Sequence, residues 1–198
     1  MNKSKLKRST KETDIECSIS FNSQDLPIRE RGVSIVDTGI GFLDHMILSL
    51  SKHSNININI KCIGDTHIDN HHTVEDIGIV LGSCLRKLIF PIENIERFGN
   101  SRIVMDETLV SCDMDLSNRP YLFYKVDTDG KVGELEIELV EEFFKSLVFN
   151  FGITLHIEMI RGKNKHHIIE SVFKSFAVSL KRALIKNNNG TPSTKGVI

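Results

Sequence analysis

The stretch "HHTVEDIGIVLGSCLRKLI", residues 71–89, has a counterpart in "HHIIESVFKSFAVSLKRAL", residues 166–184. In both stretches apolar residues recur at intervals of three and four, which predicts two amphipathic helices. The likeness continues upstream, where "FLDHMILSLSKHSNININI" (42–60) aligns with "LVEEFFKSLVFNFGITLHI" (139–157) with no gap inside the segments. Each upstream segment predicts a helix, a short turn and an alternating strand. The chain is therefore predicted to be one unit duplicated.

Segments of alternating polarity precede these units and predict hairpin strands, "ETDIECSISF" in the first half and "RIVMDETLVSCDMDLSNRPYLFYKV" in the second. Pro91 ends the first helix and lies near the boundary. We expect an α+β fold of two lobes, each a small sheet covered by helices on one side. The expected division is residues 1–95 and 96–186, with 187–198 as a tail that lacks periodicity.

Composition and charge limit the class of protein. A chain of 198 residues that is 40% hydrophobic can bury one sizeable core or two small lobes. Its four cysteines are scattered without a C-x-x-C pair, which fits a reducing compartment rather than a disulfide framework or zinc knuckle. A formal net charge of -1 gives no general field for nucleic acid. Since no stretch approaches the roughly 18 apolar residues of a membrane span, we expect a cytoplasmic protein with neither membrane nor nucleic-acid partners.

Each of the two helices begins with adjacent histidines followed by a glutamate. His71 and Glu75 lie one turn apart on one face, whereas His72 is rotated by about 100° from His71. Adjacent histidines therefore do not easily grip one ion, and each can instead serve a different ion or share one with another element or subunit. Imidazole nitrogen and carboxylate oxygen without thiolate suit Mn, Fe, Co or Zn, and octahedral Mn is compatible.

The repeat supplies a third candidate ligand in each half. His45 of "GFLDHM" aligns with Glu142 of "LVEEFF", and both lie eleven residues before their strand. A single HHxxE is more often a solvated helix face, but two copies at equivalent positions hold four of the eight histidines and favour a metal site. The predicted pseudo-symmetric set takes four ligands from the first half and four from the second: His45, His71, His72, Glu75, then Glu142, His166, His167, Glu170.

Other polar residues indicate chemistry less specifically. His53 and His67 fit the surface or an outer shell. His156 could be a ligand but more often is a satisfied strand residue, and its equivalent in the first half is Asn59. "MDE" offers Asp106 and Glu107 as acid or base groups, although carboxylates near a strand end are usually turn residues. Arg97 and Arg119 suit an anion or, equally, surface acids. Lys174 lies two turns beyond His166 on the same face, so a ligand held at the metals could extend to its ammonium. Ser193 and Lys195 suit a phosphate if the tail folds inward.

Several stretches match one known family in order: "KETDIE", "TGIGFLDHM", "GDTHIDNHHTVEDIGIVLG", "ERFG", "MDETLV", "DLSNRPYL", "GITLHI", "GKNKHHIIESVFKSFAVSL" and "PSTKG". Through them the chain resembles the imidazoleglycerol-phosphate dehydratases, the lyases of histidine biosynthesis, over almost its full length. The resemblance implies duplicated lobes of the ribosomal-protein-S5-domain-2-like type. It also implies a homo-oligomer of 24 subunits with active sites between subunits.

The resemblance further implies two Mn(II) ions per active site, bridged by the imidazole of a small phosphorylated substrate. The ligands that carry over are His45, His71, His72, Glu75, His166, His167 and Glu170. The phosphate would meet Arg97, Arg119, Lys174, Ser193, Thr194 and Lys195. Glu12 of "KET" matches a substrate-contacting glutamate, whereas Glu142 stands where many relatives have histidine.

The implied reaction converts imidazole glycerol phosphate to imidazole acetol phosphate through an enol. Two cations on the imidazole would favour loss of hydroxide, and we assign proton transfer to Glu12 together with Glu75, Asp106 or His72. Two other hypotheses stay open. One is a two-metal hydrolase that releases phosphate. The other is a non-catalytic protein, in which metal staples subunits or the fold binds RNA, although near-neutral charge and the lack of an aromatic platform disfavour RNA.

Overall fold

The computed structural model describes residues 3–22, 33–187, 190, 192 and 193. The first half of the chain supplies β1 (Lys3–Ser9), β2 (Thr13–Phe21), β3 (Val36–Asp37), α1 (Gly41–Ser54), β4 (Ile56–Gly64) and α2 (His71–Ile89). The second half supplies β5 (Phe98–Met105), β6 (Thr108–Asp115), β7 (Tyr121–Lys125), β8 (Lys131–Val132), β9 (Leu135–Glu136), α3 (Glu138–Phe151), β10 (Thr154–Arg161) and α4 (Lys165–Ala183).

The two halves share one sheet topology. The strand order is β1-β2-β4-β3 in the first large sheet and β5-β6-β10-β7 in the second. In each, the first three strands of that order pair antiparallel and the last is parallel to its neighbour. Because order and direction both recur, the predicted duplicated α+β architecture is confirmed. The division between residues 95 and 96 stays a prediction.

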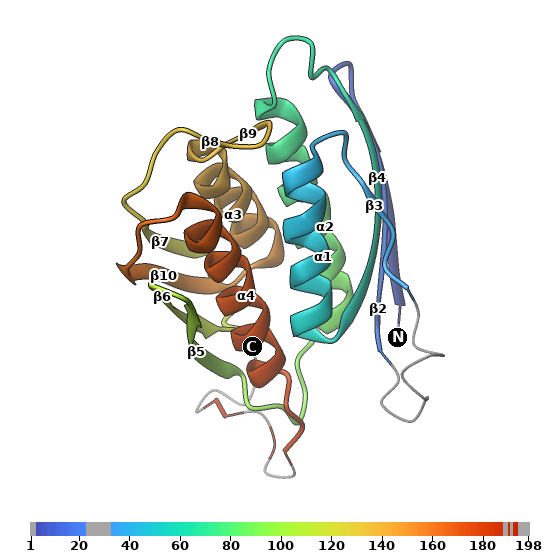
Figure 1. The fold of residues 1–198 in the computed structure, drawn as a ribbon. Helices are drawn as coiled ribbons and strands as arrows, with labels where there is room; N and C mark the ends of the chain where they lie inside the picture. The colour runs from blue at the N-terminus through green and yellow to red at the C-terminus, as the bar shows by residue number, and fades with distance from the viewer. Residues whose placement is uncertain (1–2, 23–32, 188–189, 191, 194–198) are drawn as a thin grey trace.

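The sheets form the outer layers and the helices lie between them (Figure 1). Helices α1 and α2 pack on the first sheet, α3 and α4 pack on the second, and the two pairs meet through α2 with α3 and α1 with α4. Each sheet thus has helices on one face, as predicted. A single cluster of buried apolar side chains joins both halves through this helix layer. No helix in the described part of the chain is long and apolar enough to span a membrane.

Alternation explains why β4 forms where it does. Ile56, Ile58 and Ile60 are at most 2% exposed and face the helices, while the asparagines between them are half-buried on the other face. The strand continues past the predicted end at residue 60 because it keeps pairing with β2 until Gly64 lies opposite Thr13. This extra length brings the end of β4 beside the turn that joins β1 to β2.

Helices α1 and α3 end in the same way, which reinforces the repeat. Asn55 has φ 63° and Gly152 has φ 82°, so both helices end at a left-handed residue. Asn55 directly precedes β4, and Gly152 lies two residues before β10. Asparagine and glycine are the residues that tolerate this conformation best. The two positions are equivalent in the alignment of the halves.

Helix α2 approaches α3 closely because two glycines face it. A Cβ added at Gly78 would lie 2.6 Å from the carbonyl oxygen of Phe143, and one added at Gly82 would lie even closer to that of Leu147. Gly78 and Gly82 are one turn apart and therefore share a face. The absence of side chains at these positions sets the spacing of the helices that join the two lobes.

Strand β1 is the longest element that the sequence does not predict; the two-residue strands β3, β8 and β9 are also not predicted. Only Leu6 supplies a large apolar side chain within Lys3–Ser9, so the local pattern is that of a basic, polar segment. The strand forms because it pairs with β2 over its whole length, from Lys3 opposite Ser20 to Ser9 opposite Asp14. The predicted end of α2 before Pro91 is confirmed, since the helix ends at Ile89.

Replacing Gly82 by alanine is expected to lower the free energy of unfolding, because the methyl group forces α3 away at a cost of about 1–3 kcal/mol. Alanine returns about 1 kcal/mol in a helix interior, so the expected net loss is up to about 2 kcal/mol. Gly41→Ala is the control, since a Cβ there meets nothing within 4 Å. Urea denaturation monitored by circular dichroism measures both variants. A Gly82→Ala protein as stable as the parent would contradict the role given to this contact.

Candidate metal centre and active site

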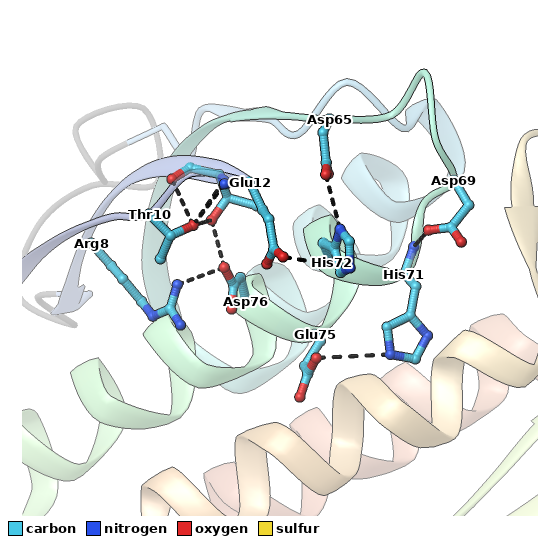
Figure 2. Close-up of polar contacts among 10 residues, drawn as sticks. Arg8, Thr10, Glu12, Asp65, Asp69, His71, His72, Glu75 and Asp76 are labelled. Atoms are coloured by element: carbon cyan, nitrogen blue, oxygen red, sulfur yellow. Dashed lines mark hydrogen bonds and ion pairs between the residues drawn. The ribbon is translucent and has the colours of Figure 1, made fainter.

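The N-terminal turn of α2 presents two different faces (Figure 2). On one face His71 Nε2 lies 3.8 Å from Glu75 Oε2. On the other, His72 lies one turn before Asp76. The rings of His71 and His72 stand at 89° to each other, and those of His166 and His167 in α4 stand at 86°. The adjacent histidines also meet different partners: His71 faces Glu75 while His72 faces Asp65, and His166 faces Glu170 while His167 faces Glu107.

Helices α1 and α4 bring His45, His166 and Glu170 together, with ligand atoms within 4.8 Å of one another. His166 Nε2 lies 3.0 Å and His45 Nε2 lies 3.6 Å from Glu170 Oε2. The Phe42 ring packs edge-on against His166 at a centroid distance of 5.1 Å and restrains its orientation. Glu170 is buried and the histidines are more exposed, so the group opens toward solvent.

The group formed within one chain takes its candidate ligands from both halves. His45 belongs to the first half, yet it joins His166 and Glu170 of the second. The cause is the helix packing, because α1 lies against α4 while α2 lies against α3. Sequence alignment of the halves gives equivalent positions but not the partners that tertiary packing brings together.

Glu170 divides its two oxygens between the histidines and a lysine. Lys174 Nζ lies 2.7 Å from Oε1, one helical turn further along α4, while Oε2 faces the histidines. Burial raises the pKa of Glu170, but hydrogen bonds from Lys174 and His166 outweigh it and the net pKa is lowered. The carboxylate is thus held ionised and aimed at the group where a cation would bind.

His72 lies between two carboxylates. Its Nδ1 donates to Asp65 Oδ2 at 2.9 Å, and its Nε2 lies 3.8 Å from Glu12 Oε1 (Figure 2). The hydrogen bond to Asp65 raises the pKa of His72 despite partial desolvation. An ionised carboxylate only accepts, so Nδ1 carries a proton, and Nε2 is the ring nitrogen that can bind a metal ion when the ring is neutral. This is the arrangement in which an outer carboxylate orients a metal-binding imidazole.

His167 repeats this arrangement with different residues. Its Nδ1 donates to Glu107 Oε2 at 2.9 Å, and its Nε2 lies 3.7 Å from Asp106 Oδ2. The backbone N–H groups of Asn164 and Lys163 donate to Glu107 Oε1 at 2.7 and 3.1 Å. Hydrogen bonds from the Asn164 backbone and then from His167 hold the pKa of Glu107 far below its usual range. Glu107 is therefore a fixed acceptor that orients the ring.

The donor set fits a divalent metal ion. Imidazole nitrogen and carboxylate oxygen are suitable ligands for Mn, Fe, Co or Zn. The cysteines Cys17, Cys62, Cys84 and Cys112 are free and buried in the core, where their thiols cannot reach these groups. Three ligands on one side of an open group leave coordination positions for water, for substrate or for residues of another chain.

Glu142 does not join a cluster of ligand atoms among the described residues. Its carboxylate instead lies 3.3 Å from Lys145 Nζ, one turn along α3. The position is equivalent to that of His45, on a helix that packs against α2. The role of Glu142 as a ligand therefore stays a prediction.

The predicted phosphate groups fall into separate places. The Arg97 guanidinium binds both oxygens of Asp115, at 2.7 and 3.0 Å, and donates to the carbonyl of Pro192 at 2.7 Å. Arg119 Nη2 lies 3.5 Å from the same Asp115. Ser193 follows Pro192 on this side of the molecule. Thr194 and Lys195 lie outside the described residues.

The arginines and the histidines lie at opposite ends of α4. The Arg97 amide donates to the carbonyl of Ala183, the last residue of α4, whereas His166 is its second residue. With 19 residues and a rise of 1.5 Å per residue, the helix separates these ends by on the order of 25 Å. A small substrate cannot span that distance, so one chain does not bring these two predicted parts of the site together.

Fold and site together define a duplicated α+β protein whose histidines and carboxylates form groups suited to a divalent metal ion. The model of the imidazoleglycerol-phosphate dehydratase family matches residues 38–180. The chain is 55% identical to the dehydratase of Aliarcobacter butzleri over 194 residues, and the alignment covers 98% of both chains. It is 57% identical over 192 residues to that of Sulfurimonas denitrificans, over 96% of this chain and 97% of the relative. The chain belongs to the imidazoleglycerol-phosphate dehydratase family, and it is a hydro-lyase of histidine biosynthesis.

Solved structures agree with this assignment. The imidazoleglycerol-phosphate dehydratase of Staphylococcus aureus is 39% identical and superposes with a TM-score of 0.82, over 93% of this chain and 99% of that one. The enzyme of Pyrococcus furiosus, solved in complex with (S)-C348, is 33% identical with a TM-score of 0.82, over 98% of this chain and 100% of that one. The family predicted from the sequence motifs is confirmed.

Sequence reasoning missed three contributors to the site. Asp65, which orients His72, lies in the loop before α2, where a carboxylate shortly before paired histidines was the available signal. Phe42 lies three residues before His45, so helical spacing could have placed it on the same face. Asp76 is a charge on the apolar stripe of α2, and a buried charge requires a partner.

Replacing His45 by asparagine is expected to weaken Mn(II) binding, because it removes one nitrogen from the group formed with His166 and Glu170. Loss of a residue that only orients a metal ligand typically weakens metal binding about 10–100-fold. Loss of the ligand His45 itself should raise the Kd at least as much. His53→Asn, two turns further along α1, is the matched control and should bind as the parent does. Isothermal titration of metal-free protein measures both. Equal affinities for His45→Asn and the parent would remove His45 from the ligand set.

Proposed function

We propose that this hydro-lyase converts imidazole glycerol phosphate to imidazole acetol phosphate with the help of two Mn(II) ions per active site. The observation that carries the metal dependence is the group of His45, His166 and Glu170, whose ligand atoms lie within 4.8 Å of one another. Such nitrogen and oxygen donors with an open side fit Mn(II). When bound, the metal would supply positive charge that stabilises negative charge developing on the substrate.

The proposed ligands form two kinds of group. The first kind is His45 with His166 and Glu170. The equivalent group would be His71 with Glu75, and Glu142 would join it by turning away from Lys145. The second kind is the outward Nε2 of a histidine whose Nδ1 is already bonded to a carboxylate. These Nε2 atoms would complete the coordination of metal ions that are bound mainly by residues of other subunits. The full proposed set is His45, His71, His72, Glu75, Glu142, His166, His167 and Glu170.

The phosphate of the substrate would bind at the arginine cluster. Two guanidinium groups face the single carboxylate of Asp115, so the cluster keeps a net positive charge. Guanidinium forks match phosphate oxygens in shape and charge. The remaining groups proposed for phosphate or substrate are Lys174, Ser193, Thr194 and Lys195.

Dehydration requires a base that removes a proton from carbon and an acid that protonates the leaving hydroxyl. We assign Glu12 as the principal proton-transfer group, because its carboxylate lies 3.8 Å from His72 Nε2 and is 52% exposed, so substrate can reach it. Glu75, His72 and Asp106 are the proposed partners for the second proton. The enol that results becomes the ketone on protonation at carbon.

The active site is proposed to lie between subunits. The separation along α4, on the order of 25 Å, keeps Arg97 of one chain away from its own histidines. A homo-oligomer solves this by placing the arginines of one subunit beside the histidines of another, and we propose an assembly of 24 subunits. The four free cysteines fit a reducing compartment, for which we propose the cytoplasm.

Metal stapling of subunits is the second candidate function. The observation that favours it is that His45 and His166 are half-exposed, so a bound ion would be accessible to a neighbouring chain. A hydrolase using the same ions is a third outcome, and it would release inorganic phosphate rather than a ketone.

The decisive assay follows dehydration of imidazole glycerol phosphate after chelation and after return of Mn(II). The proposal expects turnover to vanish on chelation and to recover with the metal, with imidazole acetol phosphate as product. Size-exclusion chromatography run in parallel reports the assembly. Metal stapling predicts dissociation on chelation without dehydration at any stage, and a hydrolase predicts free phosphate, so either result would contradict the proposed function.

A further inference from the structure

Asp76 of α2 is a buried carboxylate with two partners on one oxygen. The residue is 5% exposed. Its Oδ2 accepts a hydrogen bond from Thr13 Oγ1 at 2.5 Å and from Arg8 Nη1 at 2.6 Å (Figure 2). Arg8 belongs to β1 and Thr13 begins β2, so the two partners flank the turn between these strands. Asp76 therefore ties both sides of that turn to helix α2.

The turn between β1 and β2 is held by hydrogen bonds within it and by one from the loop before α2. The Thr10 hydroxyl accepts hydrogen bonds from the backbone N–H groups of Glu12 and Thr13, at 3.1 and 3.0 Å. The Asp65 backbone N–H donates to the Glu12 carbonyl at 3.0 Å. Glu12 thus sits on a turn whose backbone is fixed on each side, while its carboxylate extends toward solvent and His72.

Asp76 and His72 are one helical turn apart and face the same way. Because Asp76 binds the turn between β1 and β2, it also fixes the position of that turn relative to the His72 ring. The distance of 3.8 Å between Glu12 Oε1 and His72 Nε2 depends on that position. We infer that Asp76, with Arg8 and Thr13, is a positioning element that sets the Glu12 carboxylate relative to His72.

The second half of the chain lacks this element, which is informative. The hairpin registers place Ile103 at the position of Arg8 and Thr108 at that of Thr13. Ser171 takes the position of Asp76, and its buried hydroxyl has no hydrogen-bond partner among the described residues. Glu107, equivalent to Glu12, is instead fixed by backbone N–H groups and by His167.

The two equivalent glutamates therefore differ in what holds them. Glu107 is held through its own carboxylate, which is consequently committed to His167. Glu12 is held through its backbone, by way of Thr13 and Asp76, and its carboxylate stays available. The contacts of Asp76 with Arg8 and Thr13 fix the backbone of the turn, so they hold Glu12 in place without using its carboxylate.

The inference rests on the proposed role of Glu12, and a double-mutant cycle separates the two. Thr13→Val removes the hydroxyl while keeping the shape, and is expected to lower kcat about 10-fold, since small misplacements of a reacting group cost up to about 100-fold. In a Glu12→Gln background the same change should alter kcat less than about 2-fold, because Thr13 acts through Glu12. Thr13→Ser should restore most of the parent kcat.

The controls use manganese-loaded, assembled enzyme. Ser171→Ala alters the equivalent position of the other half and should leave kcat unchanged. Arg8→Met removes the other partner of Asp76 and should show the same dependence on Glu12, which covers the case in which Thr13→Val does not fold. Bound manganese, measured by atomic emission, should be the same in all variants.

The outcomes are distinguishable. If Glu12→Gln alone keeps full turnover, the proposed role of Glu12 fails and the inference fails with it. If Glu12→Gln is impaired while Thr13→Val and Arg8→Met are fully active, only the positioning role is overturned. Equal losses from Thr13→Val in both backgrounds would show a general structural effect and would also overturn it.

Discussion

The rotation of about 100° between successive residues of an α-helix is the constraint on which this site depends. Adjacent histidines at the start of a helix leave it in different directions, and His71 accordingly faces Glu75 while His72 faces Asp65. One face of α2 then carries His71 with Glu75, and the other carries His72 above Asp76. Because a single helix cannot enclose an ion with both histidines, every group needs ligands from elsewhere.

The duplicated fold supplies those other ligands by crossing the halves. Helix α1 of the first half lies against α4 of the second, so His45 meets Glu170 across the molecule. Divergence after duplication is visible at two pairs of equivalent positions. His45 corresponds to Glu142, and Glu12 corresponds to Glu107. In the second pair, the Glu12 carboxylate extends toward solvent and His72, whereas that of Glu107 is a fixed acceptor for His167.

Much of the fold could be predicted because its patterns are local. Alternating isoleucines define β4, and the repeated HHxxE with its apolar stripe defines α2 and α4. Strand β1 could not be predicted, since Leu6 is its one large apolar residue and its conformation comes from pairing with β2. The residue types of the site were predicted, but their grouping was not, because helix packing decides that His45 meets His166. Asp65 and Asp76 act through contacts between distant segments and gave only weak local signals.

The proposed active site combines histidines of one subunit with arginines of another. Complementation between two defective variants, His166→Asn and Arg97→Ala, tests it most directly. Each variant alone should be inactive, and oligomers assembled from both should regain activity, because some sites then combine intact histidines from one chain with intact arginines from another. Native mass spectrometry verifies that the subunits have mixed. Mixed oligomers that stay as inactive as the separate variants would contradict the account.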